Sequence, residues 1–237
     1  SRLKKSSSSR RVFGMENEKY YITTAIDYTN ARPHIGHALE KIQADVLARY
    51  ARLKGKEVRF LTGTDEHGVK VVRAAEAAGK KPQEFVDGLA GDFRRLKEAL
   101  SLSWDDFIRT TDQERHVPGA VFVWQKLSEA GDIYRKKYRG LYCVGHEAFV
   151  TDKDLVDGKC EEHGKAPETV EEENYFFRLS KYSEQIGRAI EKGELQILPQ
   201  SRANEILSLI DKEGLQDVSF SRPRNDLSWG IPVPHDD

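Results

Sequence analysis

The chain has 237 residues, of which 38 are basic and 39 acidic, so its formal net charge at pH 7 is −1. This balance excludes a protein that binds nucleic acid through its bulk charge, and any RNA contact must come from a local patch. No apolar run has the length of a membrane span, and two cysteines fit a soluble protein in a reducing compartment, without a membrane partner.

The N-terminus is expected to be a disordered, basic and serine-rich tail at 1–18. Its first fourteen residues hold five basic residues, five serines and no acid. They are either sequence upstream of a start at Met15 or the remnant of an organellar transit segment. The first reading goes with a cytoplasmic protein and the second with an organellar one.

The next segment predicts a strand, a tight turn and a long helix. Tyr20–Ile26 is rich in aromatic and β-branched residues, which favours a buried strand. Ala38–Lys54 has apolar residues at helical spacing, namely Leu39, Ile42, Val46, Leu47, Tyr50 and Leu53. A strand at Glu57–Thr62 follows, and the crossover is long enough to make the two strands parallel.

Two histidines stand where this helix begins. His34 and His37 are three residues apart, so they share one helix face, and Gly36 between them has no side chain to block a ligand. A helix N-terminus attracts phosphate, and imidazoles can donate hydrogen bonds to it. The alternative is an ordinary helix start with two surface histidines.

The pattern continues as a nucleotide-binding sheet. Helices are predicted at Val69–Ala78 and from Pro82, where Phe85, Leu89, Phe93, Leu96 and Leu100 form an apolar stripe that favours core over a cofactor contact. A third strand is predicted at Asp106–Thr110, and Thr111 with Glu114 predicts a capping box for the next helix. The βαβαβ order is that of half a doubly wound sheet.

From Ile133 the sequence predicts short strands and turns around two pairs of possible metal ligands. Cys143 and His146 form one pair, and Cys160 and His163 form the other after thirteen intervening residues. This layout is typical of a structural zinc knuckle with four tetrahedral ligands. The alternative is two small buried cysteines and two surface histidines.

The rest of the chain predicts few further elements. A strand is expected at Asn174–Leu179, and helices at about 181–192 and 200–212. The basic run Arg135–Arg139 is read as a solvated strand, with contact to a tRNA acceptor end as the alternative.

Most of the chain from Tyr20 onward resembles the class I aminoacyl-tRNA synthetases, and within them the methionyl-tRNA synthetase family. The stretches that carry this resemblance are Thr23–Asn30, Pro33–His37, Ala44–Arg49, Thr62–Gly68, Glu172–Ser180 and Trp229–Pro234. They occur in the order that the family shows.

The resemblance implies an α/β fold: the first half of a doubly wound, parallel, Rossmann-like sheet with an inserted α+β connective-peptide and zinc-knuckle subdomain. The expected domains are the half sheet at 19–132, the insertion at 133–228 with the zinc knuckle at 143–163, and the start of a return to the catalytic fold at 229–237. The family's second signature, Lys-Met-Ser-Lys-Ser, is absent because the only methionine is Met15. We therefore expect an N-terminal portion that is catalytically incomplete alone.

The resemblance also implies the chemistry. The parent enzyme would be a methionine-tRNA ligase that uses ATP with Mg²⁺ to form methionyl-adenylate and then charges tRNA(Met). His34 and His37 would be catalytic, and ATP would be bound by His34, Gly36, His37 and Asn30. Methionine would be bound by Ala25, Ile26, Tyr28 and Asp65. Asp65 also has a simpler reading, as the N-cap of the following helix.

Some residues depart from the family pattern. Many members carry Pro at the position of Asp27, whose carboxylate we expect to point outward, and a Cys at that of His146, which bears on the metal. Alternative functions are a binding fragment without turnover and a class I synthetase for another apolar amino acid, such as valine, isoleucine or leucine. The short insertion, about a hundred residues, favours methionine, because the resemblance implies a larger editing insertion in the others.

Overall fold

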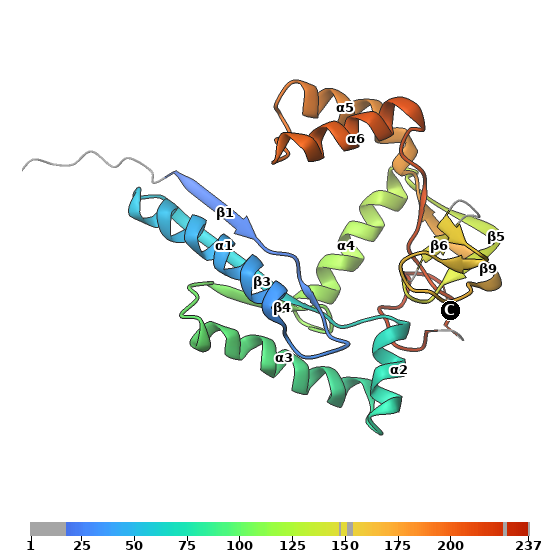
Figure 1. The fold of residues 1–237 in the computed structure, drawn as a ribbon, viewed down its shortest axis with the longest axis horizontal. Helices are drawn as coiled ribbons and strands as arrows, with labels where there is room; N and C mark the ends of the chain where they lie inside the picture. The colour runs from blue at the N-terminus through green and yellow to red at the C-terminus, as the bar shows by residue number, and fades with distance from the viewer. Residues whose placement is uncertain (1–17, 147, 151–153, 225–226, 237) are drawn as a thin grey trace, which may run out of the picture. The chain divides into compact units, whose positions relative to one another are not determined.

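The structure, a computed structural model, describes residues 18–146, 148–150, 154–224 and 227–236 (Figure 1). Of the tail predicted at 1–18, only Glu18 lies within these residues. In the described part of the chain, no helix is both long and apolar enough to cross a membrane. The chain divides into two compact units, Ser1–Asp65 with Asp87–Arg109, and Glu66–Val86 with Thr110–Asp237.

The first unit holds a parallel sheet of four strands. They are β1 (Lys19–Thr23), β2 (Asp27–Tyr28), β3 (Glu57–Asp65) and β4 (Asp106–Arg109), and all of their pairings are parallel. Leu61 of β3 pairs with both Thr23 and Asp106, so β1 and β4 lie on opposite sides of β3. The predicted α/β fold with a parallel sheet is confirmed, although the predicted first strand is interrupted after Thr23.

The long helix α1 (Ile35–Leu53) packs against this sheet through small side chains. Ala44 and Ala48 join Phe60, Leu102 and Trp104 in one buried core cluster. The helix predicted at Ala38–Lys54 is present and begins three residues earlier, but its apolar stripe is not its buried face. The six residues of that stripe are exposed by 39–86%: Leu39, Ile42, Val46, Leu47, Tyr50 and Leu53.

Three further helices follow the predicted order: α2 (Val69–Ala77), α3 (Pro82–Ala99) and α4 (His116–Glu129). Leu89 and Phe93 of α3 are buried, which confirms the predicted core stripe of this helix. The capping box predicted at Thr111 is wrong. Asp112 Oδ1 accepts the backbone N–H groups of Glu114 and Arg115, and α4 begins only at His116.

The second unit also contains an antiparallel sheet in the order β10 (Val218–Ser219), β9 (Glu168–Phe177), β5 (Ile133–Cys143) and β6 (Ala148–Val150). Between β6 and β9 in the sequence, β7 (Leu155–Val156) and β8 (Lys159–Cys160) pair as an antiparallel hairpin. The prediction of short strands is wrong for β5 and β9, which have 11 and 10 residues and pair from Ile133↔Phe177 to Tyr142↔Glu168.

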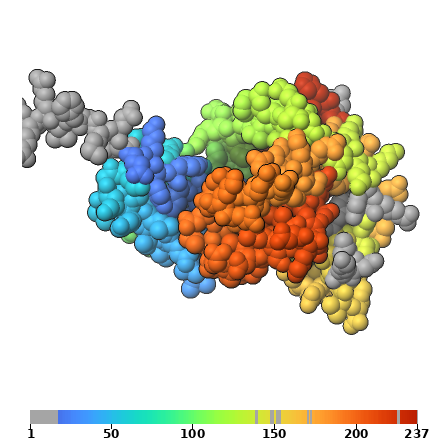
Figure 2. All heavy atoms as spheres, turned by 90° about the horizontal axis from the view of Figure 1, so that it is seen from above, coloured from blue at the N-terminus to red at the C-terminus, as the bar shows by residue number. Residues whose placement is uncertain are grey.

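The two last helices form a pair. A 3-10 turn (Leu179–Tyr182) leads into α5 (Ser183–Glu191), and α6 (Gln200–Lys212) packs beside it, as the orange spheres in Figure 2 show. The hydroxyl of Ser183 accepts a hydrogen bond of 2.9 Å from Leu215 N. Both predicted helices are therefore present.

Candidate functional site

His34 and His37 form the N-terminal cap of α1. Nδ1 of His34 accepts the backbone N–H of Gly36 at 3.0 Å, and Nδ1 of His37 accepts the backbone N–H of His34 at 3.1 Å. An imidazole nitrogen that accepts a hydrogen bond carries no proton, so each neutral ring holds its proton on Nε2. The cap thus leaves two Nε2–H donors at the positive end of a 19-residue helix.

The two rings lie together. Their centroids are 3.8 Å apart, and His34 is exposed while His37 is half-buried. A Cβ on Gly36 would come within 2.9 Å of the His34 ring, so glycine there leaves room for that ring as well as for a ligand. The predicted pairing on one helix face is therefore present, together with a capping role that spacing alone did not indicate.

Asp27 behaves differently from its prediction. It does not point outward: it is 4% exposed, and its Oδ2 contacts Nζ of Lys41, which is fully buried. Its other oxygen, Oδ1, lies 3.9 Å from Nε2 of His37. Burial raises the pKa of Asp27, and the Lys41 ammonium opposes this rise. Burial likewise lowers the pKa of His37, an effect that the Asp27 carboxylate opposes.

The residues predicted to bind methionine lie at the carboxyl ends of the strands. Tyr28 and Asp65 are direct neighbours in the ladder of β2 and β3, and Ala25 and Ile26 stand in the exposed break between β1 and β2. Open parallel sheets bind ligands at this edge. The capping role for Asp65 is wrong, because the N-cap of α2 is Gly68, without a side-chain cap bond.

Two residues whose hydrogen bonds hold the backbone at this edge, Thr29 and Glu40, were not identified from the sequence. Thr29 is fully buried, and both its N–H and its hydroxyl donate to the Asp65 carbonyl, at 3.0 and 3.1 Å. These bonds hold the turn that carries Asn30, an exposed residue predicted to bind ATP. Glu40 accepts the N–H of Ala25 at 2.9 Å. No simple sequence pattern marks either contact.

Glu66, His67 and Trp229 form a second group of contacts, which lies in the second unit. Nε1 of Trp229 donates to the carbonyl of Glu66 at 2.8 Å, and the Trp229 ring lies 5.6 Å from that of His67. The fully buried Glu66 accepts the hydroxyl of Thr111 at Oε2 and donates its N–H to Thr110. The stretches Thr62–Gly68 and Trp229–Pro234 are thus joined by a hydrogen bond across 163 residues of sequence.

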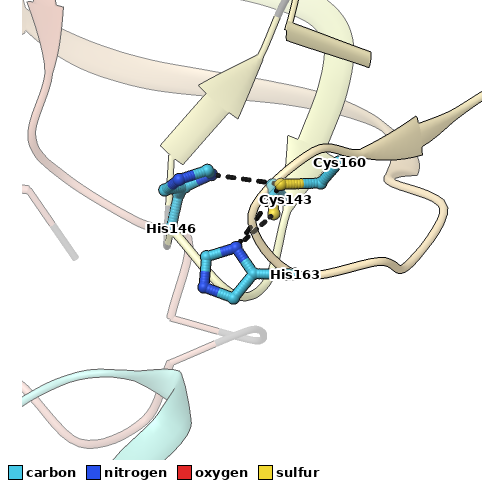
Figure 3. Close-up of side chains that lie close together, drawn as sticks. All are labelled: Cys143, His146, Cys160 and His163. Atoms are coloured by element: carbon cyan, nitrogen blue, oxygen red, sulfur yellow. Dashed lines mark hydrogen bonds between the residues drawn. The ribbon is translucent and has the colours of Figure 1, made fainter. Parts of the chain in front are cut away.

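The four predicted metal ligands come together (Figure 3). Cys143 ends β5, Cys160 ends β8, and His146 and His163 lie in the turns that follow. Nδ1 of His163 lies 3.8 Å from Cys143 Sγ and 3.4 Å from Cys160 Sγ, and Nδ1 of His146 lies 3.6 Å from Cys160 Sγ. Tetrahedral zinc places a sulfur and a nitrogen ligand about 3.6 Å apart, so the donor set fits this metal.

The surroundings of the cluster also suit a metal. Nε2 of His146 lies 2.7 Å from Oε2 of Glu162, so a neutral His146 that donates there has Nδ1 free to bind a metal. A Cβ on Gly145 would stand 2.3 Å from the His163 ring, so only glycine allows that close approach. Burial opposes ionisation of Cys143, but hydrogen bonds from its neighbours lower the pKa of its thiol overall.

Comparisons with known proteins agree with one another. The family described as tRNA synthetases class I (M) matches residues 20–164 and 150–237. Methionine–tRNA ligases of Brucella melitensis and Clostridium tetani are 47% and 44% identical over 94% of the chain. Mycobacterium tuberculosis methionyl-tRNA synthetase, solved with methionyl-adenylate, is 44% identical over 92% of the chain with a TM-score of 0.85. The chain spans 34–43% of the length of these three proteins.

Proposed function

The chain belongs to the class I tRNA synthetases of the methionine type, and from this premise we propose that it supplies the phosphate grip and part of the methionine pocket of a methionine-tRNA ligase. Such an enzyme activates methionine with ATP and transfers it to tRNA(Met). The solved relative with methionyl-adenylate supports a site for methionine and AMP. Because the chain spans less than half the length of its relatives, further groups of the parent protein would complete the reaction.

The paired imidazoles at the start of α1 carry this proposal. In the first step the methionine carboxylate attacks the α-phosphorus of ATP, a new O–P bond forms, and pyrophosphate leaves. Charge builds on the phosphate oxygens as this happens. The Nε2–H groups of His34 and His37 donate to those oxygens, with the helix dipole behind them. Mg²⁺ bound to ATP would share this charge.

The strand ends suit the amino acid. Asp65 offers a carboxylate for the α-ammonium group, beside its ladder partner Tyr28. The phenol of Tyr28 can act as a weak donor to a thioether, and Ala25 and Ile26 add apolar surface. Since apolar pockets separate similar side chains by only about 1–3 kcal/mol, the choice of methionine depends on further groups too.

We assign the cluster of Cys143, His146, Cys160 and His163 a structural Zn²⁺. The four side chains come from two turns with thirteen residues between them, and a bound ion would cross-link these turns. Protein purified without chelators should contain one zinc per chain by atomic emission. A zinc-free, folded protein would remove this assignment.

A chimera tests the proposed function. Residues 19–236 would replace the matching part of the Mycobacterium tuberculosis enzyme, and methionine-dependent exchange of labelled pyrophosphate into ATP would be measured. We expect exchange by the chimera and none, or a trace, by the 237-residue chain alone. His34→Ala and His37→Ala should each lower the exchange rate about 100-fold or more, as loss of one charge-stabilising donor does.

The control is His235→Ala, which removes an exposed histidine outside this cap and should leave exchange unchanged. Full exchange after loss of both His34 and His37 would contradict the phosphate role. Exchange that depends on valine, isoleucine or leucine in place of methionine would contradict the substrate.

A further inference from the structure

A buried ion pair adjoins the histidine cap. Lys41 of α1 is fully buried, Asp27 of β2 is 4% exposed, and Nζ of the first contacts Oδ2 of the second. A buried charge is costly unless it is paired. Among the described residues, neither Nζ of Lys41 nor Oδ2 of Asp27 has a hydrogen-bond partner, so the contact between them is a pairing of opposite charges.

The geometry joins this pair to His37. His37 and Lys41 are four residues apart on α1, so they share one face of the helix. Asp27 meets both, with Oδ2 against Lys41 and Oδ1 3.9 Å from Nε2 of His37. The Phe93 ring adds an edge contact to His37, with centroids 5.2 Å apart. His37 is therefore enclosed by the cap, an aromatic ring and a carboxylate.

The charges around His37 explain what the pair is for. The charged or titratable groups that act on it are Asp27 of β2, His34 at the N-cap of α1, and Glu40 and Lys41 within α1. An uncompensated carboxylate beside Nε2 would repel a polyphosphate that this nitrogen binds. A carboxylate matched by a buried ammonium still attracts the nearby His37 ring at short range, and it exerts a smaller net field on the more distant ligand.

We propose that Asp27 and Lys41 are positioning residues of the phosphate site: the Asp27 carboxylate, 3.9 Å from Nε2 and so not hydrogen-bonded to it, holds the His37 ring in place electrostatically, and Lys41 cancels the Asp27 charge that the polyphosphate would otherwise meet. The inference rests on the proposed function for its effect on ATP. Its structural part, the charge balance beside His37, can be tested without ATP.

Three variants give a pattern of opposite signs. Lys41→Gln removes the positive charge and keeps a donor for Asp27, so ATP with Mg²⁺ should bind about tenfold more weakly. Asp27→Asn leaves the ammonium unmatched, so ATP should bind several-fold more tightly. The double variant should bind within about twofold of the original chain. A purely structural pair would shift both single variants in the same direction or leave both affinities unchanged, and either result overturns the proposal.

The affinities would be measured by titrating ATP into the 237-residue chain and following its spectrum by NMR. If Lys41→Gln does not fold, the effect of the lysine is measured by comparing the double variant with Asp27→Asn. The tighter ATP binding expected of Asp27→Asn should then be absent from the double variant. Arg49→Met, which breaks the Asp45–Arg49 pair about two turns further along α1, is the matched control and should not change ATP affinity.

A second measurement separates this inference from the proposed function. The His37 ring is titrated by ¹⁵N NMR without ATP, and its midpoint should move to higher pH in Lys41→Gln and to lower pH in Asp27→Asn. If these shifts are seen in a chain that binds no ATP, the charge balance between Asp27 and Lys41 beside His37 is supported, and the proposed phosphate-binding role of the histidines is contradicted. An unchanged His37 midpoint in both variants would overturn the pair even if ATP binds.

Discussion

Asp45 shows how one carboxylate ties α1 to the segment after α3. Its Oδ1 accepts both the N–H and the hydroxyl of Ser103, at 2.6 and 2.5 Å, and its Oδ2 accepts Nε of Arg49 at 2.6 Å. Burial alone would raise the pKa of Asp45, but the hydrogen bonds from Ser103 and Arg49 outweigh it and lower the pKa. The ionised form is therefore favoured in the folded chain.

The lowered pKa of Asp45 determines how its contribution to the free energy of unfolding changes with pH. A group whose pKa is lowered by folding adds stability above its unfolded value, about 3.9, and the contribution is lost as the pH falls through the folded pKa. We expect Asp45→Asn to lower the free energy of unfolding by about 1.5–3 kcal/mol at pH 7 and by less near pH 2.5. Urea unfolding at both pH values measures this difference.

The control for Asp45 is Glu76→Gln, which neutralises an exposed carboxylate on α2 and should change the free energy of unfolding little at either pH. An Asp45→Asn cost that is as large at pH 2.5 as at pH 7 would show that shape, and not charge, makes the contribution.

Besides its four ligands, the proposed zinc site depends on Glu162, which contacts one of those ligands. Its carboxylate lies 2.7 Å from Nε2 of His146. When Nε2–H donates to this carboxylate, Nδ1 of the neutral ring is left to bind the metal, and the carboxylate adds negative charge beside the site. We expect Glu162→Gln to weaken zinc binding about 10–100-fold, measured by competition with a chelating dye.

Glu161→Gln alters the neighbouring exposed carboxylate and should leave zinc affinity unchanged. Equal affinities for Glu162→Gln and the original chain would show that His146 needs no partner. Cobalt substitution supplies a second readout, since the absorption of a tetrahedral Co²⁺ site depends on the ligands that remain bound.

At the level of elements, the sequence predicted the parallel sheet and the order of the helices. The order of these elements, the parallel pairing and the bounds of α6 all agree with the structure. These features follow from local periodicity and from glycine and proline at element ends, which one sequence displays. The long antiparallel pair of β5 and β9 was missed because the residues of each strand depend on partners 26 to 44 positions away, from Tyr142↔Glu168 to Ile133↔Phe177.

The face of α1 could not be predicted, and the reason is physical. Periodicity identifies a helix, but α1 carries two stripes of opposite kinds. One has large apolar side chains and the other has Ala44, Ala48 and Ala51 with buried charges. The small stripe lets the helix approach the sheet closely, so packing selects it over the more hydrophobic one.

The candidate site was predicted only in part, because sequence spacing shows local arrangements but not tertiary contacts. Spacing placed His34 beside His37 and brought the four metal ligands together, because both arrangements are set by nearby residues. The burial of Asp27 was missed because its partner is Lys41, and lysine is a residue type that is seldom fully buried. Which face a charged group takes is decided by tertiary contacts.

At the level of the whole molecule, the exposed apolar stripe of α1 has a consequence for the behaviour of the chain in solution. Among the described residues, β1 pairs only with β3, so the other edge of β1 has no strand partner, and Tyr21 of this strand is 64% exposed. Exposed apolar stripes of this extent are typical of surfaces that bind other polypeptide. The relatives, which are more than twice as long, have additional chain that could cover such a surface.

We therefore expect the 237-residue chain to bind a hydrophobic dye and to associate as its concentration rises. Replacing Leu39, Val46 and Leu53 by Gln should reduce both effects, measured by dye fluorescence and by light scattering after gel filtration. Each replacement should change the free energy of unfolding by no more than about 0.5 kcal/mol, because these side chains are already exposed. Ala48→Gln on the buried face of the same helix should instead destabilise the chain, since the closely packed core cannot take a larger polar side chain. Dye binding and association that persist in the triple variant would place the adhesive surface elsewhere on the molecule.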